Sequence, residues 1–252
     1  LADLWSEMDL ARKIQSVLLP APQQIAGRYD YAGVMKPADE VGGDYYDTIE
    51  ADGKLWVLIG DVSGHGVSAG LIMMMVQTAV RAVVQRFAAA SQPLSPGQLI
   101  TLVNRALWRN LQLIGKGQYM TMTALCIDSA GITYAGLHQP LLVFRKATGE
   151  VDEVETHGCW IGILDEIENL NEDRRLDFAP GDAIMLYTDG LIEAKLRDNP
   201  QEMLRLPPVI ARFQASCLAQ DTAIATAQSV LTETNSCIVT DDVAVVVLRH
   251  LA

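Results

Sequence analysis

Four short acidic segments stand out in this chain, because each lies at one end of an apolar run. A carboxylate at the mouth of a buried strand loses hydration, and this costs free energy unless a positive charge compensates. The neighbouring segments hold too few Lys and Arg residues to pair with all of these acids. Hard divalent cations take oxygen ligands, and Mg²⁺ is typically held by one or two carboxylates together with water. The pattern therefore predicts a metal site for two ions. The segments are Gly42-Gly43-Asp44, Gly60-Asp61-Val62-Ser63-Gly64-His65-Gly66, Tyr187-Thr188-Asp189-Gly190 and Thr240-Asp241-Asp242.

Further motifs accompany the acidic segments in a fixed order along the chain. They are Ile14-Gln15 followed by Leu18-Leu19-Pro20, the segment 37–47, and Ala135-Gly136-Leu137-His138-Gln139-Pro140. The ordered series resembles the SpoIIE/RsbU branch of the metal-dependent protein phosphatases, the PPM or protein phosphatase 2C-like (PP2C-like) superfamily. The resemblance spans roughly residues 11–249, nearly the whole chain. Any one motif alone would be weak evidence, whereas the full series at family-like spacing is specific.

The resemblance assigns a role to each acidic segment. It implies that Asp61 bridges two metal ions and that the carbonyl group of Val62 binds one of them. It also implies that Asp189 and Asp241 complete the shell of the second ion. Asp44 would act on the first ion directly or through water, so that Asp44, Asp61 and Asp189 form the predicted catalytic set. A shell made only of oxygen atoms suits Mn²⁺ or Mg²⁺.

Three residues beside this set keep two interpretations each. Asp242 is close enough to Asp241 to confuse the assignment of the ligand, as Asp47 is to Asp44. His65 could donate a proton to a leaving alkoxide, or it could simply shape its glycine-rich loop. Lys36 could contact phosphate, or it could be an ordinary solvated lysine.

Composition excludes several classes of function. The net charge of −12 argues against nucleic acid, whose phosphates require a basic surface, and against an anionic membrane surface. The four cysteines show no Cys-x-x-Cys pairing of the kind that binds metals. Cys159 lies in a segment without the donor-rich, Arg-terminated loop of a thiol phosphatase, so we expect a structural role for it. Reducing, cytoplasmic conditions fit these thiols best.

The N-terminal segment predicts an amphipathic helix over residues 1–18 that ends before Pro20 and Pro22. No targeting signal and no apolar stretch approaching the ~20 residues of a transmembrane helix are visible. We expect this chain to be a domain cut from a longer protein. Its first helix could continue into an upstream sensor or receiver domain, or it could pack on its own domain. Residues with helical spacing in this segment are Leu4, Met8, Ala11, Ile14 and Leu18.

Runs of strands separated from runs of helices favour an α+β fold with antiparallel sheets over alternating βαβ units. The resemblance implies two packed antiparallel β-sheets flanked by helices, an α-β-β-α sandwich. Since no repeat or low-complexity linker is visible, we expect a single domain over residues 1–252, with 1–19 as a lead-in helix. Expected strands cover 29–35, 44–49, 54–61, 119–127, 131–135, 141–146, 150–155, 174–178, 183–187 and 243–249; expected helices cover 67–89, 96–113, 201–216 and 221–234.

The function predicted from these features is that of a metal-dependent phosphoserine/phosphothreonine protein phosphatase in bacterial signalling, which uses water activated by two metal ions. The resemblance implies a small phosphoprotein substrate, such as a STAS-domain anti-sigma-factor antagonist or a relative of one. One candidate parent is a membrane-tethered sensor phosphatase of the SiaA kind, with this chain on its cytoplasmic side and a homodimer formed through the first helix. The alternatives are a pseudophosphatase that binds its partner without turnover and a hydrolase of small phosphoesters or nucleotides.

Two departures from the family pattern concern substrate docking and regulation rather than the ligands. Ala244 stands two positions after Asp242, where the family commonly has a hydroxyl residue. The segment 194–200 lacks the expected Phe-Gly before its helix.

Overall fold

The computed structural model describes residues 2–39, 41–115 and 117–251, with side chains from residue 10 onward. The contacts within the chain divide it into two compact units. This division reflects contact density alone, so the single domain over residues 1–252 stays a prediction. Unit 1 comprises Leu1–Leu19, Asp39–His138 and Thr156–Asp177, and unit 2 comprises Pro20–Ala38, Gln139–Glu155 and Phe178–Ala252.

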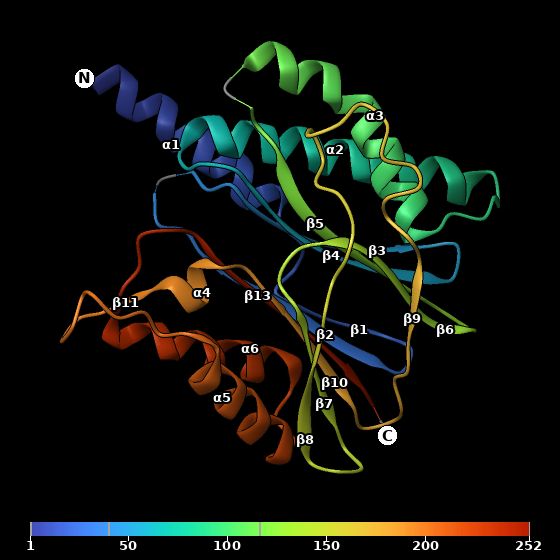
Figure 1. The fold of residues 1–252 in the computed structure, drawn as a ribbon, viewed down its shortest axis with the longest axis vertical. Helices are drawn as coiled ribbons and strands as arrows, with labels where there is room; N and C mark the ends of the chain where they lie inside the picture. Colours follow the sequence, from blue (N-terminus) through green and yellow to red (C-terminus); the bar gives the residue numbers. More distant parts are fainter. Residues whose placement is uncertain (1, 40, 116, 252) are drawn as a thin grey trace. The chain divides into compact units, whose positions relative to one another are not determined.

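Unit 1 is built on a five-stranded antiparallel sheet with the strand order β3-β4-β5-β6-β9. Helices α2 and α3 lie on one face of this sheet and bury an apolar core with it (Figure 1). Helix α3 begins where the Ser95 hydroxyl accepts the N–H of Gln98 and Pro96 takes the first helical position, two features that favour a helix start. The elements are β3 (Asp44–Ala51), β4 (Lys54–Val62), β5 (Met120–Asp128), β6 (Gly131–Leu137), β9 (Arg174–Leu176), α2 (Val67–Ala89) and α3 (Pro96–Ile114).

Unit 2 is built on a six-stranded sheet with the strand order β1-β2-β13-β10-β7-β8, again antiparallel throughout. Helices α5 and α6 pack on this sheet over a second apolar core (Figure 1). Strands β10 and β13 lie at the centre of the sheet, and nearly all of their residues are buried. The elements are β1 (Gln23–Ala26), β2 (Tyr29–Lys36), β7 (Leu141–Arg145), β8 (Glu150–Val154), β10 (Ala183–Tyr187), α4 (Gly190–Glu193), β11 (Lys195–Leu196), α5 (Leu206–Leu218), α6 (Ala223–Leu231), the 3₁₀ helix η1 (Thr232–Ser236), β12 (Cys237–Ile238) and β13 (Val243–His250).

The predicted α+β class with antiparallel sheets is confirmed, and two predicted helices need correction. The helix expected over 201–216 begins only at Leu206, since Met203 pairs with Lys195 in an isolated bridge and Pro207 stands near the helix start. The helix expected over 221–234 ends at Leu231 and continues as a 3₁₀ helix. The short elements β1, α4, β11 and β12 were not predicted, because segments of two to four residues carry no periodic signal.

Helix α1 (Ala2–Leu18) is fixed to unit 1 by side-chain to backbone contacts. The buried Gln15 donates from Nε2 to the carbonyl of Gly42 at 2.8 Å and accepts the N–H of Gly42 at 3.2 Å. Gln77 of α2 donates to the carbonyl of Leu18 at 2.6 Å. The predicted first helix is therefore confirmed, and it lies against the segment that leads into β3.

The apolar stripe predicted for this helix is described only in part. Leu4 and Met8 lie outside the residues whose side chains the structure describes. Ala11 is half-buried, and Ile14 is 46% exposed. Packing of the whole stripe on its own domain, or against a partner, therefore stays a prediction.

Helix α2 is the single helix among the described residues whose length and apolar composition would suffice to cross a membrane. The core helix of a globular unit passes the same test. Ile72, Val76 and Val80 of α2 are buried in the core of unit 1. Its apolar character is thus accounted for by packing on the sheet.

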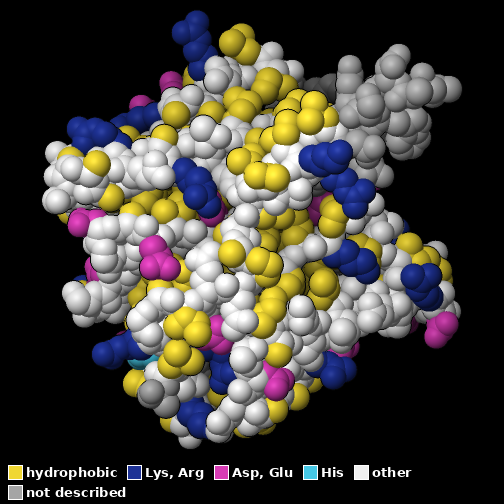
Figure 2. Space-filling view, turned by 180° about the vertical axis from the view of Figure 1, so that it is seen from behind, with side chains coloured by type: hydrophobic (Ala, Val, Ile, Leu, Met, Phe, Trp, Pro, Cys, Tyr) yellow, Lys and Arg dark blue, Asp and Glu magenta, His cyan; other side chains and the backbone are white. Residues whose placement is uncertain are grey.

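The surface carries mixed charge. On the face shown in Figure 2, Lys and Arg side chains are dispersed among Asp, Glu and apolar side chains. Exposed ion pairs such as Arg212 with Glu233 contribute little to stability. Most of the acidic surplus is therefore ordinary solvated surface.

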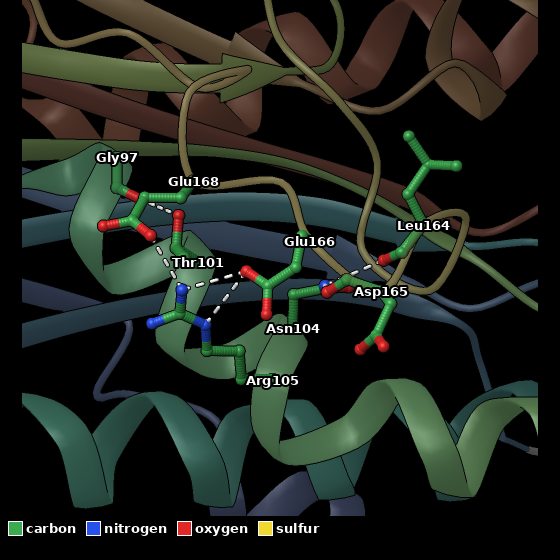
Figure 3. Close-up of polar contacts among 8 residues, drawn as sticks. All are labelled: Gly97, Thr101, Asn104, Arg105, Leu164, Asp165, Glu166 and Glu168. Carbon is green, nitrogen blue, oxygen red and sulfur yellow. Dashed lines mark hydrogen bonds and ion pairs between the residues drawn. The ribbon is translucent and has the colours of Figure 1, made fainter.

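The loop that follows β8 is held against α3 by a fully buried amide (Figure 3). Asn104 donates to the carbonyls of Leu164 and Asp165 at 2.9 and 2.8 Å, and it accepts the N–H of Gly162 at 2.8 Å. At the next position of the helix, the Arg105 guanidinium lies between the carboxylates of two glutamates of the same loop, Glu166 and Glu168.

A buried ion pair joins helix α2 to strand β3. Arg81 donates from Nε and Nη2 to the two carboxylate oxygens of Asp47 at 2.8 and 2.6 Å. The Asp47 side chain is fully buried, whereas that of Arg81 is 38% exposed. Burial raises the pKa of Asp47, and the hydrogen bonds and charge of Arg81 oppose this rise. The carboxylate of Asp47 is therefore paired with the Arg81 guanidinium. This pairing leaves Asp44 rather than Asp47 as the candidate metal ligand.

We predict that Arg81→Met lowers the free energy of unfolding by about 2 kcal/mol, less than for a fully buried pair because Arg81 is partly exposed. Without the cation the pKa of folded Asp47 rises further above its unfolded value, so stability is retained at low pH and lost as pH rises through the folded pKa. Urea titrations should show a larger deficit at pH 8 than at pH 5. The control Arg86→Met, at an exposed position of the same helix, should change stability little. A pH-independent deficit would contradict this account.

Candidate metal centre

Two of the predicted ligands face each other in the sheet of unit 1. Asp44 opens β3, and Asp61 lies near the end of β4, directly opposite it in the antiparallel register. Asp44 is 1% exposed and Asp61 is half-buried. Directly opposite residues share one face of a sheet, and like charges in that position repel. A cation bound to both carboxylates would offset this repulsion.

The backbone beside Asp61 is fixed by neighbouring strands. The N–H of Val62 donates to the carbonyl of Gly43 at 3.3 Å, and the Val62 side chain is fully buried in the core. Val62 can therefore serve as a ligand only through its carbonyl group, as the resemblance implies. Beyond it, Gly64 and Gly66 have φ values of 86° and 80°, so the turn from β4 into α2 requires a conformation that glycine adopts readily.

The other two predicted ligands lie at one end of the sheet of unit 2. Strands β10 and β13 are antiparallel neighbours, and the segments that leave β10 and enter β13 are held together by Thr188. Its N–H donates to the carbonyl of Ala244 at 3.1 Å, and its hydroxyl accepts the N–H of Ala244 at 2.8 Å. Asp189 follows this clamp and Asp241 precedes it, so both belong to the same sheet end. The side-chain hydroxyl that the family has at position 244 is absent, yet the backbone of Ala244 is held.

Asp189 occupies a half-buried position at the start of helix α4. Burial raises its pKa, and the carboxylate of Glu193 adds to this effect. The N–H groups of Gly190 and of Asp189 itself oppose the rise by hydrogen bonding to the carboxylate. Position 190 must be glycine, because a Cβ there would collide with the carbonyl of Asp242. The chain thus places a carboxylate where a bound cation would stabilise its charged form.

The structure separates Asp241 from Asp242. Asp242 is 3% exposed, and its Oδ1 accepts the N–H of Ala38 at 2.8 Å, which ties the end of β2 to the start of β13. Asp241 is exposed and its Oδ1 accepts the N–H of Asp242 at 2.8 Å. Asp242 therefore has a structural task, and Asp241 is the better candidate for a ligand.

The two residues with open roles also have definite places. His65 is 76% exposed at its side chain, and its Nδ1 lies 3.1 Å from Oδ2 of Asp39. Lys36, at the end of β2, is half-buried and donates to the Thr234 hydroxyl at 3.4 Å. Lys36 is therefore not an ordinary solvated lysine, while its contact with phosphate and the catalytic role of His65 stay predictions.

The donor chemistry of these residues fits a hard divalent cation. Among the residues that the structure describes, no three Asp, Glu, His or Cys side chains gather closely enough to hold a metal by themselves. Mg²⁺ requires no such group, since one or two carboxylates and several waters complete its shell. Each unit presents two predicted carboxylates at strand ends, and all of their donor atoms are oxygens.

The cysteines take no part in this arrangement. Cys159 is half-buried, and burial raises the pKa of its thiol, so the thiolate needed for nucleophilic attack is disfavoured. Burial likewise raises the pKa of Cys126 and of Cys217 to about 12. These shifts support the structural role expected for Cys159.

Two residues near Asp61 escaped the sequence prediction. Thr121 of β5 lies opposite Asp61 and contacts its backbone, and the ring of His138 contacts the Thr121 hydroxyl. In the sequence, His138 stood out only as part of the motif 135–140, and Thr121 had no assigned role. Since the pairing of β4 with β5 brings together residues that are 60 positions apart, no local pattern could reveal this contact.

Comparison with solved structures identifies the fold. The SiaA-PP2C domain of Pseudomonas aeruginosa superposes with a TM-score of 0.78 at 20% identity, covering 98% of this chain and 96% of that domain. The structure of RsbX in complex with magnesium gives a TM-score of 0.63 at 13% identity, covering 90% of this chain and 97% of that chain. The predicted PP2C-like fold is thereby confirmed.

The family follows from sequence comparison. The family described as stage II sporulation protein E (SpoIIE) matches residues 51–251, and the chain belongs to this family. Phosphoserine phosphatase RsbU of Bacillus subtilis (strain 168) is 26% identical over 222 residues, which cover 85% of this chain and 62% of the relative. The chain therefore spans less than two thirds of that relative, whose name carries the enzyme class predicted from the sequence.

We predict that Asp241 and Asp242 separate in stability and metal binding. Asp242→Ala should lower the free energy of unfolding by about 1–3 kcal/mol, because the N–H of Ala38 loses its acceptor. Asp242→Asn retains an acceptor oxygen and should cost less. Asp241→Ala should cost less stability, because Asp241 is exposed and water can replace its contact with the N–H of Asp242, but it should bind Mn²⁺ about tenfold more weakly, since a charged oxygen ligand is lost. Urea denaturation and calorimetric Mn²⁺ titration measure the two effects. Equal stability of the two alanine variants would reject the division of roles.

Proposed function

We propose that this chain is a metal-dependent phosphatase domain that hydrolyses phosphoserine or phosphothreonine in a signalling protein of a bacterium. The observation that carries the proposal is the register pair Asp44 and Asp61 in unit 1. Directly opposite residues share one face of the sheet, so the two carboxylates present oxygen donors side by side, which suits a site for divalent cations. Membership of the SpoIIE family and the name of the RsbU relative support the phosphatase assignment.

The proposed ligands are Asp44, Asp61 and the carbonyl of Val62 in unit 1, together with Asp189 and Asp241 in unit 2. Mn²⁺ or Mg²⁺ is the proposed cofactor, as two ions, in keeping with the oxygen donors and with the magnesium named for RsbX. Such ions, when bound, lower the pKa of a water molecule and offset negative charge on the phosphoryl group.

The chain's own residues prepare this chemistry by fixing where the carboxylates lie. Thr121 holds the backbone of Asp61, and the N–H of Gly190 holds the carboxylate of Asp189. Asp242 secures the strand end beside Asp241 through Ala38. Preorganised charges cost little reorganisation during the reaction, which is why such supporting contacts matter to the rate.

The proposed substrate is a small phosphoprotein, such as a STAS-domain anti-sigma-factor antagonist or a relative of one, as the family resemblance implies. We propose a cytoplasmic location for the chain, within a protein that also carries a sensor or receiver domain. Control by that domain would act through α1, because Gln15 hydrogen-bonds to the backbone of Gly42, which precedes the proposed ligand Asp44 by two residues. A homodimer formed through α1 would give such control a route. The alternative is a pseudophosphatase that binds its partner without turnover.

We predict that Asp61→Ala abolishes phosphate release from a phosphoprotein in saturating Mn²⁺ and leaves the fold intact, because the variant also removes repulsion from Asp44. Asp189→Asn should weaken Mn²⁺ binding as well as turnover, since an amide oxygen carries no charge. Matched controls are Asp52→Asn in the β3–β4 turn and Asp198→Asn in an exposed loop, which should behave as wild type. The assays are phosphate release, with a free nucleotide as comparison substrate, and calorimetric Mn²⁺ titration. Activity of Asp61→Ala within about threefold of wild type would reject its role as a ligand, because loss of a metal-bridging group costs far more in rate.

A second experiment tests the choice of nucleophile. Thiol alkylation should leave activity unchanged, EDTA should remove it, and added Mn²⁺ should restore it, because water rather than a thiolate attacks the phosphoryl group. Loss of activity on modification of Cys159 with Mn²⁺ still bound would support covalent thiol chemistry instead. Normal Mn²⁺ binding by a wild-type protein that releases no phosphate would favour the pseudophosphatase.

A further inference from the structure

A chain of hydrogen bonds runs from the end of strand β6 to the predicted ligand Asp61 within unit 1. The Thr121 hydroxyl accepts the N–H of Asp61 at 3.2 Å and lies 3.3 Å from the Asp61 carbonyl, to which it can donate. Nδ1 of His138 lies 2.8 Å from the same hydroxyl. The Thr121 side chain thus hydrogen-bonds to the peptide groups on both sides of the Asp61 Cα. The His138 ring in turn hydrogen-bonds to the Thr121 side chain.

The single proton of the Thr121 hydroxyl fixes how this chain can be satisfied. A hydroxyl donates once and accepts twice, so Thr121 cannot donate to the Asp61 carbonyl and to His138 together. If Nδ1 of His138 carries a proton, the ring donates to Thr121 and the hydroxyl donates to the Asp61 carbonyl. Every contact is then satisfied, so the network selects the Nδ1–H form of the ring.

The His138 end of the network is itself anchored. The Thr156 hydroxyl donates to the carbonyl of His138 at 2.5 Å, and its oxygen accepts the N–H of His138 at 3.0 Å. Thr156 is 4% exposed, so water competes little for these bonds. The backbone that carries the His138 ring is therefore fixed by the fold.

We infer that His138 and Thr121 are positioning residues for Asp61, with His138 orienting the Thr121 hydroxyl and Thr121 fixing the backbone that carries the carboxylate. The inference rests on the proposed function, since it assumes that Asp61 binds a metal. Groups that orient a metal ligand without touching the metal typically change affinity or activity by about 10–100-fold when they are removed.

Strand β5 offers a matched control on the same face. Thr123 lies two residues beyond Thr121, so its side chain points to the same side of the sheet. The Thr123 hydroxyl is buried and has no hydrogen-bond partner among the described residues. Replacement of either threonine by valine removes one hydroxyl from the same strand at nearly equal volume. Only the change at position 121 breaks the contact with Asp61.

The experiment compares Thr121→Val, Thr121→Ser and Thr123→Val by calorimetric Mn²⁺ titration, phosphoprotein kinetics and thermal melting. Thr121→Val should weaken Mn²⁺ binding by about 10–100-fold and lower kcat, with KM for the phosphoprotein nearly unchanged. Thr121→Ser retains the hydroxyl and should restore both quantities to near wild type. Thr123→Val should match wild type in binding and kcat. If Thr121→Val behaves as Thr123→Val does, Thr121 has no positioning role.

Variants at position 138 test the ring. An Asn side chain can place an amide donor near the position of Nδ1, so His138→Asn should retain most of the Mn²⁺ affinity and kcat that His138→Ala loses. An equal loss in both variants would overturn the positioning role of His138. A wild-type protein that neither binds Mn²⁺ nor releases phosphate would defeat the proposed function itself. Wild-type activity with unaffected Thr121 and His138 variants would defeat only the present inference.

Discussion

The register of β3 against β4 is the constraint on which the candidate metal site of unit 1 depends. The β3–β4 register fixes the two carboxylates opposite each other, one of them almost completely shielded from water. Like charges in opposite positions repel, and a cation bound to both carboxylates would offset this repulsion, so binding of such a cation would also stabilise the fold. The buried pair of Asp47 and Arg81 on the same strand shows how the fold compensates a carboxylate when it uses its own cation.

A threonine hydroxyl supports the backbone near the candidate ligands in each unit. Thr121 contacts the N–H and the carbonyl of Asp61, and Thr188 contacts the N–H of Ala244 between the segments that carry Asp189 and Asp241. A threonine can accept and donate from one rigid side chain, which allows it to fix a backbone where the strand ladder ends. Ligand positions therefore depend on ordinary polar residues as much as on the acids.

The comparisons agree with this distinction between the acidic candidate ligands and the residues that support them. The SiaA-PP2C domain retains the fold at 20% identity, so most side chains in these sheets can change while the architecture persists. A core tolerates substitution when volume and pattern are kept. A carboxylate that binds a cation at a strand end would have no such freedom, because neither an amide nor an apolar group supplies its charge. This is why short acidic motifs carry a family resemblance that overall identity hardly reveals.

The sequence by itself determined the α+β class, the long helices and strands, and the acidic strand ends, because these features depend on local periodicity and on residue chemistry. It could not place the start of helix α5 or reveal the short strands, because the bridge of Lys195 with Met203 and the pairing of Lys195 with the distant Ile238 leave no periodic signal in the sequence. Tertiary structure alone decided between adjacent acids. In the folded protein Asp47 pairs with Arg81, and Asp242 accepts the N–H of Ala38. Asp44 and Asp241 therefore remain as the candidate metal ligands. Tertiary structure also brought His138 and Thr121 to Asp61, because strand pairing joins residues that no sequence spacing connects.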